Sequence, residues 1–343
     1  MFKIKNRKLD YKKKAFIIAE IGINHNGDIK KAYKLIDAAV KAKCDAVKFQ
    51  TFDVDTMVHK SADLAQYQKK FSNTNQKKML KKYELSYESF LKIKKYCDKK
   101  KIIFLSTPFD IKSADFLRNL VPAFKISSGD NDNYLLLEHI TKFNKPIILS
   151  LGMTNHKEIY KILKDIRLNK SKLALLHCIS EYPTLLKDSQ LGVINELKKT
   201  GHIIGFSDHT IGYEASLGAI CLGAKIIEKH ITLNNNMIGP DHKASLNVKH
   251  LRDFIDKIRT MENLVKFQKR KITKNEFKTK LIAKKSLFFS GKINKNDKIK
   301  KSNLIPMRPF KNGIPISDYK KILNKKTTSE KSKYQQIKLK DIK

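Results

Sequence analysis

Short apolar runs alternate with longer amphipathic segments along the first three-quarters of the chain. Runs of three or four residues that are rich in β-branched side chains predict buried strands. The segments between them place apolar residues three to four positions apart, which predicts helices that pack one face on a core. This alternation is typical of a parallel sheet joined by crossover helices. The predicted strands are Phe16–Ala19, Ala46–Phe49, Ile102–Leu105, Ala123–Ile126, Pro146–Leu149, Leu173–Leu176, Ile203–Phe206 and Lys225–Ile227. The predicted helices include Asp28–Lys43, Tyr87–Lys99, Asn155–Arg167 and Tyr213–Leu222.

Eight strands that alternate with helical segments match the size and order of a TIM barrel, which needs roughly 250 residues. An open, doubly wound sheet is the alternative architecture. Its dinucleotide-binding form carries a Gly-x-Gly-x-x-Gly turn, and the chain lacks this motif. The fold class that we expect is therefore an α/β TIM (β/α)8 barrel.

The chain changes character after its last predicted barrel helix, Val248–Phe267. Residues 269–280 are rich in lysine and read as a linker. From Leu281 onward the chain shows short strand-like runs and turn signals such as Asn312-Gly313. We therefore expect a barrel domain at 1–268, a linker at 269–280 and a small β-rich domain at 281–343.

The formal net charge is +39, from 72 Lys and Arg against 33 Asp and Glu. Such an excess would attract polyanions, so a polyanion-binding protein is the alternative of another class. Only seven of the basic residues are Arg, however, and the lysines lie on nearly every predicted helix instead of forming one stripe. Arg is the side chain that most often binds phosphate and guanine through two hydrogen bonds. A lysine excess that is spread evenly is therefore expected to lie on solvent-exposed faces as a bias of composition, and we expect no nucleic-acid partner.

The cysteines and the N-terminal segment indicate the compartment. The four cysteines form no Cys-x-x-Cys pair, so neither a disulfide framework nor a zinc knuckle is predicted. The apolar run that begins at Phe16 ends at Glu20, far short of the ~20 residues that a membrane span requires. We therefore expect a cytoplasmic protein without a membrane segment.

Lysines and hydroxyl side chains occur at the ends of several predicted strands. Residues at these ends lie on the C-terminal rim of a TIM barrel, where such barrels place their chemistry. Lys48 and Lys125 each interrupt an apolar strand. With the hydroxyls of Thr107, Ser128 and Ser150, they would form a pocket for a small anion that carries a phosphate and a carboxylate. The alternative for either lysine is a solvated charge on the rim.

Two histidines, His209 and His230, end neighbouring predicted strands. Their imidazoles could share one ion, with a carboxylate from Glu20 or Asp241 nearby. Two nitrogens completed by water and a substrate oxygen suit an exchangeable divalent ion, for which we expect Mn²⁺, with Mg²⁺ or Co²⁺ as alternatives. A single histidine is more often a hydrogen-bonded core residue, but the pair favours metal binding.

Several strings of residues at these strand ends occur in a fixed order along the chain. They are Ala-Glu-Ile-Gly-Ile-Asn-His-Asn-Gly at 19–27, Val-Lys-Phe-Gln at 47–50, Ser-Thr-Pro at 106–108, Lys-Ile-Ser-Ser-Gly-Asp at 125–130, Gly-Phe-Ser-Asp-His-Thr at 205–210, Glu-Lys-His at 228–230 and Gly-Pro-Asp-His-Lys-Ala-Ser-Leu at 239–246. The ordered set resembles the sialic acid synthase family, which includes N-acetylneuraminate, legionaminate and pseudaminate synthases. The likeness covers nearly the whole chain.

The resemblance implies a TIM barrel followed by a small antifreeze-like (SAF) domain at 281–343, and a homodimer whose subunits exchange these domains. It implies a transferase that condenses phosphoenolpyruvate with N-acetylmannosamine or a close amino-sugar relative, releasing phosphate and forming N-acetylneuraminate or an analogue. By position, it implies phosphoenolpyruvate contacts at Lys48, Thr107, Lys125, Ser128, Ser150 and Ser207, metal ligands at His209 and His230, sugar contacts at Glu20, Gln50, Tyr182 and Asp241, and an arginine, Arg308, that reaches into the partner's site. The expected catalytic residues among them are Glu20, Lys48, Lys125, His209 and His230.

One departure from the family pattern bears on the substrate. Residues 178–183 read Cys-Ile-Ser-Glu-Tyr-Pro, whereas members specific for N-acetylmannosamine often carry Asn at the position of Ser180. Glu181 resembles legionaminate-type sequences more closely. An N,N'-diacetyllegionaminate synthase that uses 2,4-diacetamido-2,4,6-trideoxymannose is therefore the alternative activity. A metal-dependent aldolase on the same barrel would also need rim histidines and lysines, but no phosphoenolpyruvate.

Overall fold

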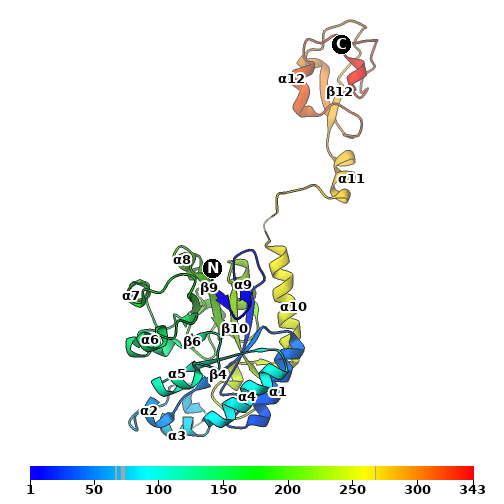
Figure 1. The fold of residues 1–343 in the computed structure, drawn as a ribbon. Coiled ribbons are helices and arrows are strands. Elements are labelled where there is room, and N and C mark those ends of the chain that lie inside the picture. The colour runs from blue at the N-terminus through cyan, green and yellow to red at the C-terminus, as the bar shows by residue number, and fades with distance from the viewer. Residues whose placement is uncertain (66–67, 71–73, 267) are drawn as a thin grey trace. The chain divides into compact units, whose positions relative to one another are not determined.

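The computed structural model describes residues 1–65, 68–70, 74–266 and 268–343 (Figure 1). The chain divides into two compact units, of which the first ends at Lys266. The first unit holds a parallel sheet, and the second is built from the residues after Lys266.

Within the described residues, eight parallel strands form a sheet in the order β5-β4-β3-β10-β9-β8-β7-β6. The first of these strands along the chain, β3, pairs with the last, β10, and the two ends of the order, β5 and β6, lie next to each other, so the sheet closes. The TIM barrel prediction is confirmed, and the open doubly wound alternative is wrong. The strands are β3 (Phe16–Gly22), β4 (Ala46–Thr51), β5 (Ile103–Pro108), β6 (Phe124–Ile126), β7 (Ile147–Ser150), β8 (Leu173–Cys178), β9 (Ile203–Asp208) and β10 (Ile226–Thr232), with the short β11 (Leu246–Asn247) beside β10.

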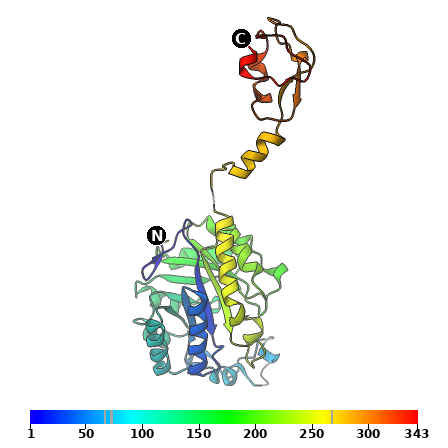
Figure 2. The same ribbon diagram turned by 90° about the vertical axis from the view of Figure 1, so that its right-hand side faces the viewer.

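Helices cover the outside of the barrel, as the view in Figure 2 shows for α1 and α10. Side-chain caps set where they begin: Asp28 accepts a hydrogen bond from the Lys30 N–H at the start of α1, and Asn155 with Glu158 forms a capping box at the start of α7. The barrel helices are α1 (Ile29–Ala42), α4 (Tyr87–Lys99), α5 (Ile111–Leu117), α6 (Tyr134–Thr141), α7 (His156–Ile166), α8 (Val193–Lys198), α9 (Glu214–Cys221) and α10 (Val248–Leu264).

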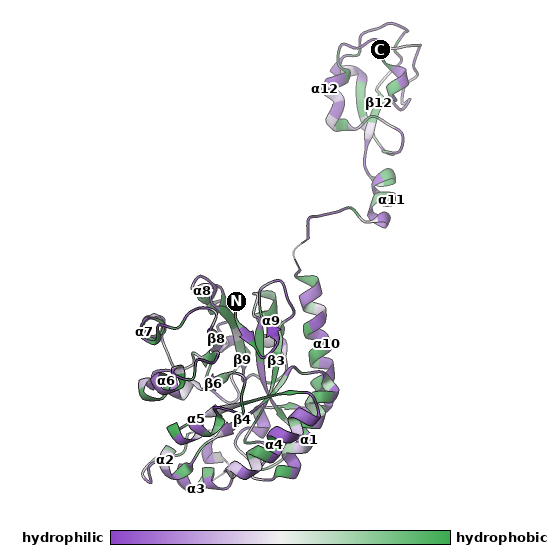
Figure 3. Cartoon of the chain, in the orientation of Figure 1, coloured by the Kyte–Doolittle hydropathy of each residue, from purple (hydrophilic) through white to green (hydrophobic). Residues whose placement is uncertain are grey.

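The helices alternate hydrophilic and hydrophobic residues, whereas the barrel strands are largely hydrophobic (Figure 3). This agrees with strands that are buried on both faces of a parallel sheet. The last residue of the helix predicted at 248–267 lies outside the described residues. In the part of the chain that the structure describes, none of the helices is both long and apolar enough to cross a membrane.

A two-stranded hairpin before the barrel covers the end at which the barrel strands begin. Its strands β1 (Lys3–Ile4) and β2 (Arg7–Lys8) are antiparallel. The side chains of Phe2, Ile4 and Leu9 are buried in a cluster with residues that lie mostly near the starts of the barrel strands. The hairpin does not cover the opposite end, where the strands have their carboxyl ends and where TIM barrels place their active sites.

The segment between β4 and α4 has a small apolar cluster of its own. It contains α2 (Val54–Met57) and α3 (Gln76–Lys81), which are capped by Asp53 and Asn75. The apolar side chains of this segment pack together beside the main barrel core. The buried members of this satellite cluster are Ile23, Phe52, Val54, Leu64, Met79 and Tyr83.

The second unit has its own core around an antiparallel pair of strands. Strand β12 (Ser286–Phe289) pairs with β13 (Leu304–Met307), and the helix α12 (Tyr319–Ile322) follows them in the chain. Its buried apolar residues are Leu287, Phe289, Ile293, Ile299, Ile314, Ile322 and Ile337. That this unit is an antifreeze-like domain stays a prediction.

The segment predicted as a linker, 269–280, contains most of the helix α11 (Lys274–Ala283). Thr273 caps this helix by accepting a hydrogen bond from the Glu276 N–H. No residue of α11 is buried in the described structure, so capping and helix-forming side chains account for it instead of core packing. A helix without a buried stripe gives no periodic signal in the sequence.

Candidate active site

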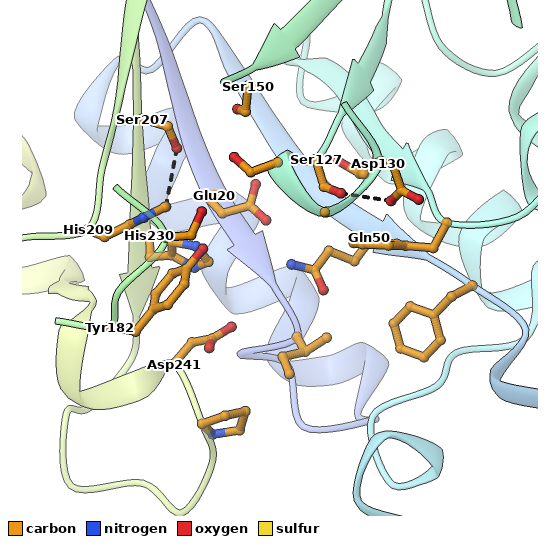
Figure 4. A pocket seen from close by; sticks show the side chains of 18 of the residues that line it. Glu20, Gln50, Ser127, Asp130, Ser150, Tyr182, Ser207, His209, His230 and Asp241 are labelled. Atoms are coloured by element: carbon orange, nitrogen blue, oxygen red, sulfur yellow. Dashed lines mark hydrogen bonds between the residues drawn. The ribbon is translucent and has the colours of Figure 1, made fainter. Parts of the chain in front are cut away.

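A cavity of about 550 Å³ opens at the carboxyl ends of the barrel strands (Figure 4). This volume is typical of a small-molecule site. The structure brings all the barrel residues that the sequence singled out to the lining of this cavity. They are Glu20, Lys48, Gln50, Thr107, Lys125, Ser128, Ser150, Tyr182, Ser207, His209, His230 and Asp241. Arg308 lies in the second unit, directly after β13.

The two-residue period of a β-strand explains why residues distant in the sequence meet here. Side chains two positions apart point to the same face of a strand. Lys48 and Gln50 on β4 are such a pair, and so are Ser207 and His209 at the end of β9. Because parallel strands end at the same mouth of a barrel, these pairs converge on one cavity.

Two lysines form the positive region of the cavity. Lys48 Nζ donates a hydrogen bond to Thr107 Oγ1 at 3.1 Å, and Lys125 Nζ donates to Ser150 Oγ at 2.7 Å. Both lysines are buried, with 4% and 2% of their surface exposed. Since a buried ammonium group is stable only beside negative charge, this region suits an anionic ligand.

Glu228 lies between the two lysines, and the predicted set of site residues omitted it. Its Oε1 is 3.7 Å from Lys125 Nζ, and its Oε2 is 3.8 Å from Lys48 Nζ. Ser207 Oγ donates to Glu228 Oε1 at 2.8 Å. Burial would raise the pKa of Glu228, but the two lysines outweigh burial and lower this pKa to about 2. The sequence did hold a signal, because Glu228 precedes His230 by two residues on β10 and so faces the same side.

Two further carboxyl groups in the cavity are shifted towards the neutral form. Burial raises the pKa of Glu20 to about 8, although Lys48 Nζ, 2.9 Å from Glu20 Oε2, acts in the opposite direction. Apart from this ion pair, the Glu20 oxygens have no hydrogen-bond partner among the described residues. Burial also raises the pKa of Asp241 to about 6. Both groups can therefore exchange a proton near neutral pH, as a general acid or base must.

A bulge at Gly22 shapes the strand beside Glu20. The pairing of β3 with β4 shifts register between Glu20 and Gly22. Gly22 has a φ of +51°, and a Cβ atom at this position would lie 2.9 Å from Glu20 Oε1. Because glycine adopts this conformation without strain and leaves that room, the bulge lets the Glu20 carboxyl occupy the cavity.

The rings of His209 and His230 lie close together, with their centroids 5.7 Å apart. His209 Nδ1 donates to the Ile179 carbonyl oxygen at 2.6 Å, which leaves Nε2 with a lone pair, 3.3 Å from Ser207 Oγ (Figure 4). His230 Nδ1 is buried without a hydrogen-bond partner among the described residues. The Tyr182 ring lies 4.2 Å from the His209 ring, centroid to centroid. Burial lowers the pKa of both imidazoles, so both are neutral at pH 7.

This pair of histidines fits a divalent ion that has few protein ligands. Neutral imidazoles offer lone pairs, and a hydrogen bond that fixes the other ring nitrogen, as at His209, is the usual support of a ligating histidine. Across residues 1–65, 68–70, 74–266 and 268–343, no group of three or more His, Cys, Asp and Glu side chains is arranged to hold a metal. An ion on His209 and His230 would therefore take further ligands from water or substrate.

Residues 35–276 match the model of the NeuB family. The chain belongs to the NeuB family. A NeuB relative named as the N,N'-diacetyllegionaminic acid synthase of Campylobacter jejuni is 41% identical over 323 residues, which cover 92% of this chain and 96% of the relative. The protein of the same name from Legionella pneumophila is 36% identical and covers 90% of this chain and 89% of the relative.

A solved structure of the N-acetylneuraminic acid synthetase from Leptospira borgpetersenii, in complex with citrate, is also similar to this NeuB protein. Its TM-score is 0.71 at 32% sequence identity, and the match covers 81% of this chain and 94% of that one. The resemblance to the sialic acid synthase family that the ordered strings indicated is confirmed.

One side of the cavity in this NeuB protein is apolar, and the sequence analysis did not predict it. All of these side chains except Val58 belong to, or pack against, the satellite cluster. In a sequence, an apolar residue that faces a cavity looks the same as one that packs in a core, so the sequence alone could not identify them. This apolar wall consists of Ile23, Phe52, Met57, Val58, Leu80 and Phe109.

Replacing Glu228 with glutamine is expected to destabilise the metal-free NeuB protein by about 3 kcal/mol at pH 7, because the two lysines lose their shared counter-charge. The folded-state pKa of Glu228, about 2, lies below its ordinary value of 4.5. Its stabilisation is therefore present above about pH 4.5 and is lost as the pH falls towards 2. Urea unfolding of both proteins at a series of pH values from 7 to 3 measures the difference.

The control is Glu196→Gln, which removes the carboxylate of an exposed ion pair with Lys199. Water screens exposed ion pairs and makes their contribution small, so this variant should unfold almost as the original protein does. A destabilisation by Glu228→Gln that is the same at pH 7 and pH 3 would contradict the assigned role of the charge.

Proposed function

We propose that this nonulosonate synthase of the NeuB family is a transferase that condenses phosphoenolpyruvate with an N-acetylated amino sugar. The product is a nine-carbon sugar acid, and phosphate is released. The observation that carries the proposal is the meeting of two buried lysines, Lys48 and Lys125, and two neutral histidines, His209 and His230, in the lining of one cavity. We also propose a cytoplasmic location, with which the four free cysteines agree.

The lysine region is suited to phosphoenolpyruvate because it combines two cations with several hydroxyl donors. Lys48 and Lys125 would neutralise the phosphate and the carboxylate, and the hydroxyls of Thr107, Ser128 and Ser150 would supply neutral hydrogen bonds. In the free protein, the Lys48 and Lys125 ammonium groups lie close to the carboxyl oxygens of Glu20 and Glu228. When phosphoenolpyruvate binds, its negative charges would take over part of these contacts with the lysines. The enolpyruvate carbon C3 is thereby fixed beside the second substrate, which replaces a chance encounter with a defined geometry.

The bond changes follow from the two substrates. C3 of phosphoenolpyruvate forms a bond to the aldehyde carbon of the open-chain sugar, water adds at C2, and the bond from C2 to the phosphate oxygen breaks. The aldehyde oxygen gains a proton, for which Glu20 is the first candidate donor and Asp241 the second, because burial raises the pKa of both. A divalent ion on His209 and His230, for which we propose Mn²⁺, would supply Lewis acidity towards the aldehyde oxygen.

The proposal is tested by offering phosphoenolpyruvate with N-acetylmannosamine or with 2,4-diacetamido-2,4,6-trideoxymannose. Stoichiometric release of phosphate and a nine-carbon acid in the mass spectrum are expected with at least one sugar. Pyruvate in place of phosphoenolpyruvate is the matched control, and product formed from pyruvate would identify an aldolase instead. Binding to a polyanion that disappears at moderate salt, without turnover of any sugar, would favour the polyanion-binding alternative.

Exposed apolar side chains in the segments after four barrel strands support a further part of the proposal, a homodimer. Leu135, Met153, Ile211 and Ile238 follow β6, β7, β9 and β10, and each exposes between 66% and 78% of its surface. Large apolar side chains gathered at one end of a barrel indicate a surface that another protein chain covers. We propose that the second unit of a partner chain covers it.

Arg308 in the second unit is placed on a well-anchored loop. The carbonyl oxygen of Pro309 accepts hydrogen bonds from Ser286 Oγ at 2.6 Å and from Gln336 Nε2 at 3.0 Å. Arg308 itself is exposed. A fixed loop that presents an exposed guanidinium group suits contact with an anionic substrate in the partner's cavity.

A mixture of Arg308→Ala and Lys125→Met subunits is expected to regain activity that neither variant has alone. In a mixed dimer, one cavity combines an intact barrel with an intact arginine. Random exchange makes half of the dimers mixed with one intact site each, so recovery should approach about one-quarter of the original activity. Phosphate release after joint unfolding and refolding measures this. Failure to exceed the sum of the two separate variants would contradict the shared site.

A further inference from the structure

A buried ion pair lies behind the two histidines of the cavity. Lys229 Nζ is 3.1 Å from Asp208 Oδ2, and neither side chain exposes more than 1% of its surface. The two residues are register partners on β10 and β9. Each directly precedes a histidine, His230 or His209, so it points to the opposite face of its strand, away from the cavity. In the described part of the chain neither of them lines the cavity, and the proposed reaction uses neither.

The surroundings of this ion pair are apolar. Phe206 precedes Asp208 by two residues on the outer face of β9 and is buried in the main core. Ile227 and Ile231 flank Lys229 in the same way on β10. Two charges lose their hydration in such a place, and well-packed apolar side chains of similar size are usually at least as stable. The stability of the fold therefore does not by itself account for an ion pair here.

The ion pair holds the residue that follows His209 in the chain. Asp208 Oδ1 accepts hydrogen bonds from the N–H and the hydroxyl of Thr210, at 2.9 and 2.7 Å. Lys229 Nζ donates to the Thr210 carbonyl oxygen at 2.6 Å. Ser216 Oγ, on α9, donates to the second Asp208 oxygen at 2.5 Å. The N–H, the carbonyl and the hydroxyl of Thr210 are thus all bonded to the ion pair, and the ion pair is bonded to the helix.

His209 lies between these fixed residues and is held from the other side as well. Its carbonyl oxygen accepts a hydrogen bond from the Thr184 N–H at 3.0 Å. Its Nδ1 donates to the Ile179 carbonyl oxygen at 2.6 Å. A rotation of the backbone that moved the His209 ring would break these bonds together with those of Thr210. The ring therefore has one position relative to its strand.

The same ion pair links His209 to the second histidine. Lys229 directly precedes His230 on β10, and Asp208 directly precedes His209 on β9. The contact between Lys229 and Asp208 therefore ties the backbone of one imidazole to that of the other. Ligands whose separation is set in advance bind an ion more tightly than ligands that must first be ordered.

We infer that Asp208 and Lys229 are positioning residues, which hold His209 and His230 at the separation that a shared divalent ion requires. The inference rests on the proposed function, because the ion belongs to that function. Groups behind a metal site that orient its ligands contribute roughly 10- to 100-fold to metal affinity. The ion pair would contribute in this way without touching the ion or the substrates.

The test replaces both charges with apolar side chains of similar size, in the double variant Asp208→Leu/Lys229→Met. Since the apolar pair needs no compensation for lost hydration, its midpoint of urea unfolding should be no lower than that of the original protein. Its affinity for Mn²⁺, measured by titration calorimetry without substrate, should nevertheless fall by about tenfold or more. A stable fold with a weakened metal site separates positioning from packing.

A milder variant keeps the inference testable if the double variant does not fold. Thr210→Val preserves the shape of the side chain and the ion pair but removes the hydroxyl that bonds to Asp208. Loss of this one bond should lower the Mn²⁺ affinity by roughly three- to tenfold.

A second buried ion pair provides the matched control. Lys331 Nζ is 2.7 Å from Asp341 Oδ1, and both side chains are buried in the second unit. The double variant Asp341→Leu/Lys331→Met makes the same chemical change there. It should keep the Mn²⁺ affinity of the original protein.

The outcomes separate the inference from the function on which it rests. Unchanged Mn²⁺ affinity in a folded Asp208→Leu/Lys229→Met protein overturns the inference and leaves the metal site intact. If that protein does not fold, full Mn²⁺ affinity in Thr210→Val overturns it. An equal loss of affinity in the control variant also overturns it, since the effect would then be general. If the original protein binds no Mn²⁺, the inference and the metal part of the proposed function both fail.

Discussion

Exchanging Lys125 for methionine is expected to lower kcat/KM for phosphoenolpyruvate by about 10³-fold, because it removes one of two buried cations that hold the anion. The loss should fall on both kcat and KM, since the lysine fixes the position of C3 as well as the charge. It should also leave Glu228 facing the phosphate with one cation fewer, which adds repulsion to the lost attraction. Phosphate release at varied phosphoenolpyruvate, with circular dichroism to confirm folding, measures the effect.

Lys145→Met is the matched control for this prediction. Lys145 also donates to a neighbouring group, the Val121 carbonyl oxygen at 2.7 Å, and burial lowers its pKa as it does for Lys125. It does not line the cavity in the described structure. Its variant should keep kcat/KM within about twofold. If Lys125→Met also stays within a few-fold of the original enzyme, the anion does not bind between the two lysines.

Removing the divalent ion with a chelator is expected to abolish turnover, and Mn²⁺ is expected to restore it. His209→Ala should lower activity by about 10³-fold even in excess Mn²⁺, because one of two protein ligands is lost. Its Mn²⁺ affinity, measured by titration calorimetry without substrate, should fall by at least tenfold. That measurement does not depend on catalysis.

His177→Ala is the control for the metal prediction. His177 is another buried imidazole near the end of a barrel strand, β8, but its Nε2 bonds the Ser189 carbonyl oxygen at 2.8 Å and it does not line the cavity. This variant should keep its Mn²⁺ affinity, even if its stability falls. Unchanged Mn²⁺ affinity and undiminished turnover in His209→Ala would refute the metal assignment.

The barrel and most of its lining could be predicted because they combine two strong signals. Each strand is a short apolar run bounded by polar residues, and each candidate side chain interrupts or ends such a run. Lys48 and Lys125 stand out for this reason, because a charged residue is rare inside a buried strand. In a closed barrel all the parallel strands end on the same side, so candidate residues from different strands are expected to lie around one opening.

The features that escaped prediction lack such a contrast. Glu228 sits beside Lys229 and His230, and three polar residues in a row do not by themselves show which of them point inward. Only when His230 is taken to face the cavity does the two-residue period of the strand place Glu228 there too. The hairpin strands Lys3–Ile4 and Arg7–Lys8 are too short to show a period. The apolar wall consists of side chains that look like core residues in the sequence, and only the cavity beside them reveals a second role.

The N-terminal hairpin also offers a site for attaching the protein to a surface. Met1 is 70% exposed, while the next residue, Phe2, is 1% exposed, so the chain enters solvent directly from the floor of the barrel. A tether attached ahead of Met1 would point away from the mouth, and enzyme immobilised through it on a sensor chip or a flow-reactor bead would still admit both substrates. The hairpin residues should not be removed to make room for the tether. Loss of Phe2, Ile4 and Leu9 would expose the apolar cluster at the end of the barrel where the strands begin, and this would destabilise the barrel.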